Sequence, residues 1–103
     1  MDERLRLAHA KKRDANEKAI VEELRARNIS VIQTDVIDLI VGYHSRNYLF
    51  EVKNPDTCFL KDGITYRAGA IKESQTKIRR TYRGQYSIVT MLSEILTQIG
   101  YEQ

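Results

Sequence analysis

The sequence has a single cysteine, Cys58, and this scarcity excludes whole classes of protein. A lone cysteine cannot form a disulfide within the chain, which rules out a disulfide-stapled scaffold and a cysteine-rich zinc site. The two histidines, His9 and His44, do not have the spacing of metal ligands. The low cysteine content favours a reducing compartment, and we expect a cytoplasmic protein.

Long apolar runs are also missing. No stretch approaches the roughly 18 apolar residues of a membrane-spanning helix, so no membrane partner is expected. Residues 1–13 carry five basic residues and no apolar segment, which does not fit a secretory signal. The chain has 103 residues, of which 42% are hydrophobic and 30% are charged. That length and composition predict one globular domain over residues 1–103.

Basic residues are clustered rather than spread evenly. Between residues 67 and 83 the only acidic residue is Glu73, against six basic ones: Arg67, Lys72, Lys77, Arg79, Arg80 and Arg83. A second basic stretch, the N-terminal arm over residues 1–13, ends with Lys12 and Arg13. Such clusters are typical of proteins that bind a phosphate backbone. A solvated helix face is the alternative interpretation.

Hydrophobic spacing and turn residues predict seven elements in the order α-β-β-β-α-β-α. The first helix begins at Asp14, which forms a capping box with Glu17, and ends near Asn28. Strands are expected over 30–34, 37–43, 48–53 and 86–90, and further helices over 70–82 and 92–99. Residues 44–47 form a polar connection, and 54–69 form an inserted loop or small hairpin. The fold class is α/β (α+β), a central mixed four-stranded sheet flanked by helices.

Three charged residues interrupt the apolar pattern of the central strands. Asp38 lies within the apolar run 36–41, and Glu51 and Lys53 share one face of the next strand. If the two strands pair through the short connection, Asp38 approaches Glu51, and two adjacent carboxylates are costly without a cation. Mg²⁺ takes one or two protein carboxylates together with water and phosphate oxygens. A buried salt bridge among the three residues is the alternative.

Two polar residues on predicted helices are further candidates for the same magnesium site, and each also has a purely structural explanation. Glu17 lies one helical turn before the apolar Ile20 and Val21, but it is also the expected capping-box partner of Asp14. Gln75 lies on the apolar stripe of Ile71, Ile78 and Tyr82 and needs a polar partner there, unless it is a boundary residue.

Together these residues resemble the PD-(D/E)xK nuclease superfamily. Asp38, followed after twelve residues by Glu51-Val52-Lys53, is similar to its central motif. Asn16-Glu17 and Gln75 resemble the flanking motifs of the virus-type replication–repair nuclease (VRR-NUC) subgroup. The resemblance covers about residues 13–99 and implies a restriction-endonuclease-like core. Two departures are Ile37, in place of a proline that often precedes the aspartate, and the long segment 54–69.

The resemblance implies a divalent-metal-dependent phosphodiester hydrolase. Carried over by position, Asp38, Glu51 and the main-chain carbonyl of Val52 ligate Mg²⁺ or Mn²⁺, and Glu17 holds a metal-bound water or a second metal. Lys53 orients or activates the attacking water, and Gln75 holds the scissile phosphate or Lys53. The expected products carry a 5′-phosphate and a 3′-hydroxyl.

Single-domain members of this subgroup resemble Holliday-junction resolvases, including those of phages. Cutting two strands requires two active sites, so the resemblance implies a homodimer acting on branched DNA and no small-molecule substrate. The predicted DNA contacts are the six basic residues of 67–83 together with Lys12 and Arg13. Phe59 or Tyr66 stacks on an unpaired base, or packs within the protein. The alternatives are a nuclease-fold module without catalysis, and a nuclease acting on flaps or linear duplex.

Overall fold

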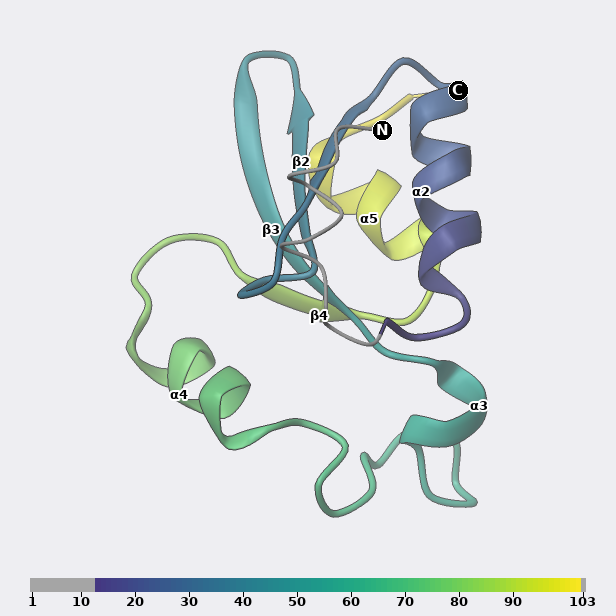
Figure 1. The fold of residues 1–103 in the computed structure, drawn as a ribbon, viewed down its shortest axis with the longest axis vertical. Helices are drawn as coiled ribbons and strands as arrows, with labels where there is room; N and C mark the ends of the chain where they lie inside the picture. The colour runs from purple at the N-terminus through teal and green to yellow at the C-terminus, as the bar shows by residue number, and fades with distance from the viewer. Residues whose placement is uncertain (1–12, 103) are drawn as a thin grey trace.

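In the computed structural model, the described residues are 13–102, and they form one mixed α/β unit (Figure 1). A four-stranded sheet has the spatial order β1-β2-β3-β4. The strands are β1 (Ser30–Gln33), β2 (Leu39–Tyr43), β3 (Arg46–Val52) and β4 (Ser87–Val89). The helices are α2 (Glu17–Ala26), α3 (Pro55–Cys58), α4 (Glu73–Thr81) and α5 (Leu92–Ile99).

The pairing of the strands confirms the predicted topology. β1, β2 and β3 form an antiparallel meander, and β4 returns after α4 to pair with β3 in parallel. Leu39 pairs with Phe50, and Glu51 pairs with Ile88. The mixed sheet flanked by helices is therefore as expected from the sequence.

The hydrophobic core lies between one face of the sheet and helices α2 and α5. Figure 1 shows these two helices side by side on the same side of the strands. Alternation along each strand turns one set of residues toward the helices. This core is made of Ile20, Val21, Leu24, Ile29, Leu39, Val41, Phe50, Val52, Val89, Ile95, Leu96 and Ile99. The opposite face of the sheet carries the alternate residues, Asp38 and Glu51 among them.

Several predicted boundaries were wrong, and the reason in each case is local. The connection between β2 and β3 is shorter than 44–47, because His44 and Ser45 both have positive φ, as a tight turn between antiparallel strands requires. Pairing therefore reaches Tyr43 and Arg46, and β3 starts before residue 48. Asp38 lies just before β2 rather than inside it.

The helices that reach the carboxylates, α2 and α4, also differ from expectation at their ends. The N-cap of α2 is Asn16 rather than Asp14, so Glu17 is not a capping-box partner. Helix α4 starts at Glu73 instead of residue 70, because residues 67–70 form a turn closed by Ala70 N–H to the Arg67 carbonyl. Tyr82 caps α4 and is half exposed, so it does not belong to a buried stripe.

The segment 54–69 contains a short helix followed by a small hairpin. Pro55 starts α3, whose N-cap Asn54 accepts a hydrogen bond from the Asp56 N–H. Phe59 and Tyr66 then form an isolated antiparallel bridge. The expected hairpin is thus present, although its arms are too short to count as strands.

Among the described residues, no helix is long and apolar enough to cross a bilayer. Most of the N-terminal arm, including Lys12, lies outside the described residues.

Candidate functional site

Asp38 immediately precedes β2, and Glu51 lies near the end of β3. Because Leu39 pairs with Phe50, the antiparallel register places Asp38 opposite Glu51, on the face away from the core. Glu51 is fully buried and Asp38 is 5% exposed. The Oδ2 atom of Asp38 accepts a hydrogen bond of 2.8 Å from the Val52 N–H. The predicted approach of the two carboxylates is therefore a property of the fold.

A compact loop holds Asp38 in place. Thr34 N–H donates to the Asp38 carbonyl at 3.2 Å, and the Thr34 hydroxyl donates to the Ile37 carbonyl. The Ile37 N–H in turn donates to the Thr34 hydroxyl oxygen at 3.0 Å. These hydrogen bonds fix the backbone just before β2 and thereby fix the position of Asp38.

Glu17 is fully buried at the start of α2 and is bound to Arg13. The Nη1 atom of Arg13 lies 2.7 Å from Glu17 Oε2 and 3.9 Å from Asp38 Oδ1. Gln33 Nε2 donates to the same Glu17 oxygen at 2.9 Å. Burial raises the pKa of Glu17 and the charge of Asp38 adds to this, while Gln33 and Arg13 act in the opposite direction. Glu17 and Asp38 are thus neighbours that share one guanidinium group.

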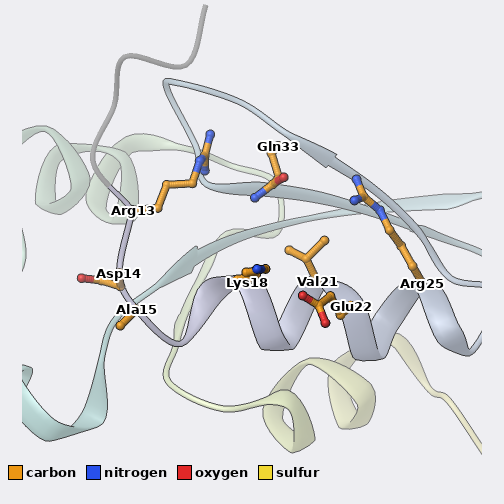
Figure 2. Close-up of a pocket in the computed structure, with 8 residues that line it drawn as sticks. All are labelled: Arg13, Asp14, Ala15, Lys18, Val21, Glu22, Arg25 and Gln33. Carbon is orange, nitrogen blue, oxygen red and sulfur yellow. The ribbon is translucent and has the colours of Figure 1, made fainter. Parts of the chain in front are cut away.

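Arg13, one of the predicted DNA contacts, reaches the buried carboxylates. Its Nη2 atom donates to the Thr34 carbonyl at 2.9 Å and its Nη1 atom donates to Glu17. A pocket of about 430 Å³ between α2 and β1 is lined on one side by Arg13 and Gln33 (Figure 2). In this structure the guanidinium therefore serves as the counter-ion of buried carboxylates.

Gln75 connects helix α4 to the site. Its Nε2 atom donates to Glu51 Oε2 at 3.0 Å, and its Oε1 atom accepts from the Lys72 N–H at 3.0 Å. The side chain is 6% exposed. Gln75 is therefore not a boundary residue, and it orients the carboxylate of Glu51.

Lys53 lies at the end of β3 and lines a second pocket. Its N–H donates to the Val89 carbonyl at 2.8 Å, which continues the parallel pairing, and the residue is 8% exposed. The pocket has a volume of about 240 Å³, and its walls include Asp14, Cys58 and Lys72.

Three residues of the site were not assigned a role from the sequence. Tyr86 precedes β4, and burial together with the nearby charge of Glu51 raises its pKa. The side-chain amide of Asn16 donates to the carbonyls of Lys53 and Thr90, both at 3.0 Å. Gln33 binds Glu17 from β1. Tyr86 lies on the same face of the sheet as Glu51 because Glu51 pairs with Ile88, two residues further along. The sequence does not give this parallel register, so it could not predict the position of Tyr86.

The six basic residues predicted to bind DNA between residues 67 and 83 are all exposed. They lie on α4 and the segments on either side of it. Their charge therefore faces solvent at the same end of the molecule as α3 and the hairpin (Figure 1).

The donor set fits a magnesium or manganese ion better than a zinc ion. Glu17 Oε1 is buried without a hydrogen-bond partner, and the Asp38 and Glu51 carboxylates lie opposite each other. No group of three or more His, Cys, Asp or Glu side chains that could hold a metal ion occurs within the part of the chain that the structure describes, so at most two such side chains would bind a cation here. Mg²⁺ does not need such a group, because water and substrate phosphate supply its other ligands.

No family model, curated protein or solved structure matches this chain. What the protein does must accordingly be inferred from the residues of the site and their geometry.

Proposed function

We propose that this protein is a divalent-cation-dependent DNA endonuclease with a restriction-endonuclease-like core, similar to the VRR-NUC subgroup. The observation that carries the proposal is the buried pair of Asp38 and Glu51, placed opposite each other, with Lys53 two residues further along the strand. Buried carboxylates that repel one another are retained where a cation binds between them.

The chain's own residues have distinct parts in this proposal. Asp38, Glu51 and the Val52 carbonyl hold Mg²⁺ or Mn²⁺, which, when bound, acidifies water and stabilises charge on the phosphate. Lys53 contacts the phosphate and the attacking water as a compact cation. Gln75 acts through Glu51, and Arg13 with Gln33 keeps Glu17 oriented. The products are a 5′-phosphate and a 3′-hydroxyl.

Branched DNA, in particular the four-way junction, is the substrate that we propose. The chain supplies one set of site residues, so two symmetric cuts require a homodimer. A candidate contact surface is the face of the sheet opposite α2 and α5, where Ile32, Ile40 and Leu49 are aligned across three strands. Ile32 is 59% exposed there.

The competing proposal is a nuclease-fold module that binds DNA without cutting it. The open basic surface around α4 supports DNA binding in either case. What favours catalysis is the burial of Glu51 and Lys53, because retaining both charges inside the protein is costly without a function.

A cleavage assay separates these possibilities. Labelled four-way junction, flap, linear duplex and single strands are incubated with Mg²⁺, Mn²⁺ or EDTA. We expect paired nicks in the junction that require the cation and are lost in Lys53→Ala and Lys53→Arg. Lys18→Ala, which removes an exposed lysine from α2, is the matched control and should cut normally.

Binding without cleavage under every metal condition would establish the non-catalytic module. Preferential cleavage of flaps or duplex would retain the chemistry and replace the junction as the substrate.

A further inference from the structure

The hairpin over residues 59–66 presents two aliphatic side chains to solvent at its tip. Leu60 is 49% exposed and Ile64 is 79% exposed. The aromatic residues that the sequence suggested for base stacking are not at the tip. Phe59 and Tyr66 are half-buried at the base of the hairpin, where their ring centroids are 5.0 Å apart. The exposed apolar surface is therefore aliphatic.

A dense set of hydrogen bonds defines the shape of this hairpin. Leu60 N–H donates to the Thr65 carbonyl at 2.7 Å, and Arg67 N–H donates to the Cys58 carbonyl at 2.8 Å. Asp62 accepts from the N–H groups of Ile64 and Thr65, both at 2.9 Å, and from the Thr65 hydroxyl at 2.6 Å. Gly63 has the positive φ that the turn needs. Leu60 and Ile64 are thus held outward, and little conformational entropy remains to be lost on binding.

The charges around the hairpin favour a nucleic acid over a protein partner. Lys61 lies between the two aliphatic residues and Arg67 follows the second arm. The one carboxylate at the tip, Asp62, accepts three internal hydrogen bonds that lower its pKa and keep it ionised, so it offsets one of the two positive charges of Lys61 and Arg67 and the balance stays positive. The hairpin also follows directly from Cys58, which lines the same pocket as Lys53. A phosphate backbone held at that pocket would lie at the base of the hairpin.

We propose that the hairpin is an apolar wedge that recognises branched DNA, in which Leu60 and Ile64 insert between base pairs at the branch point. This inference rests on the proposed function and specifies how that site selects its substrate. Aliphatic side chains that enter a base step must unstack it, and this costs free energy in continuous duplex. At a branch the stacking is already interrupted, so the wedge enters at lower cost and favours the branch.

The test compares the variant Leu60→Ser/Ile64→Ser with Leu60→Met/Ile64→Met, which keeps the tip apolar. Binding to a four-way junction and to a duplex of the same sequence is measured by fluorescence anisotropy in EDTA. A junction with 2-aminopurine at the branch point reports unstacking. Both positions are exposed, so we expect unchanged thermal unfolding for each variant.

We expect the serine variant to lose about tenfold in its preference for the junction over the duplex, the equivalent of one weak stacking contact. Its affinity for duplex should not change, and the 2-aminopurine signal seen with the wild type and the methionine variant should disappear. An unchanged junction preference, or no 2-aminopurine response to the wild-type protein, would overturn the wedge. If the serine variant still cuts DNA and still prefers the junction over the duplex, the wedge is overturned but the proposed function is not. If the wild-type protein neither binds nor cuts DNA, the proposed function is overturned together with the wedge.

Discussion

Glu17 has a carboxyl group that the fold removes completely from solvent. Burial is the main cause of its raised pKa, and the negative charge of Asp38 acts in the same direction. A carboxyl whose folded-state pKa lies above its ordinary value of 4.5 binds its proton more tightly in the folded than in the unfolded chain. The contribution of Glu17 to stability is therefore largest at low pH, and it falls as the pH rises through the folded-state pKa.

Because the pKa of Glu17 is raised in the folded state, the effect of Glu17→Gln on stability should depend on pH. We expect the free energy of unfolding of the wild type to fall, relative to the variant, as pH rises from about 4 toward about 8. Urea unfolding of both proteins across this range measures the difference. The opposite slope would mean that Arg13 and Gln33 dominate the electrostatics of Glu17.

Arg13 forms a buried i,i+4 ion pair, and Arg27 forms an exposed pair of the same spacing with Glu23, also at 2.7 Å. Arg13→Ala leaves a buried carboxylate without its cation, which we expect to cost about 1–3 kcal/mol in the free energy of unfolding. Arg27→Ala should cost about 0.5 kcal/mol or less, because its pair is exposed to water. Equal losses in urea unfolding would contradict the role assigned to Arg13.

Arg13 and a bound cation should also compete, since both are attracted to Glu17 and Asp38. We expect Mn²⁺ to raise the melting temperature of Arg13→Ala more than that of the wild type, and EDTA to reverse both shifts. Asp38→Asn removes a proposed ligand and should abolish the shift. An identical Mn²⁺ effect in all three proteins would indicate that the cation binds elsewhere.

At the scale of elements, one face of helix α4 contacts the candidate site and the opposite face carries basic residues. Gln75 faces the sheet and holds Glu51, while Lys77, Arg79 and Arg80 are exposed to solvent. The helix thus carries exposed positive charge on one face and a contact to Glu51 on the other. This arrangement suits a phosphate backbone that runs over α4 toward the site.

Removing charge from α4 should change the salt dependence of DNA binding. We expect Arg79→Ala/Arg80→Ala to make the slope of log affinity against log salt shallower by about 0.9 for each phosphate that the variant no longer neutralises. Anisotropy titrations at several salt concentrations in EDTA measure this slope, with Lys18→Ala as the control. Weaker binding with an unchanged slope would mean that the two arginines do not bind phosphates.

For the whole molecule, the sheet face opposite α2 and α5 is the surface that we propose for contact with a second copy. Ile32, Ile40 and Leu49 form a continuous apolar row there. We expect the wild type to be a dimer by light scattering and Ile32→Glu to be a folded monomer, since a charge in an isologous interface meets its own copy. Ile64→Glu, which places the same charge on the hairpin, should remain dimeric. A monomeric wild type would contradict the dimer.

The order of the elements followed from local sequence signals, whereas their ends did not. Apolar spacing located α2 and α5, because amphipathic helices leave a strong periodic pattern. The end of β2 and the start of β3 depended on positive φ at His44 and Ser45, residues that do not require this conformation. The sequence of such a short polar stretch does not determine how many of its residues form the turn and how many extend the strands.

The sequence alone determined which carboxylates meet. Asp38 directly precedes β2 and Glu51 lies on the adjacent β3, and a short connection joins the two strands, so antiparallel pairing is enough to bring the two residues together. Only the tertiary structure decided the rest of the site, because Arg13, Gln33 and Tyr86 reach it from segments far apart in the chain. The exposed tip at Leu60 and Ile64 also depended on the fold, since the pairing of Phe59 with Tyr66 turned the aliphatic residues outward. Contacts between distant segments are set by packing and register, which no local pattern encodes.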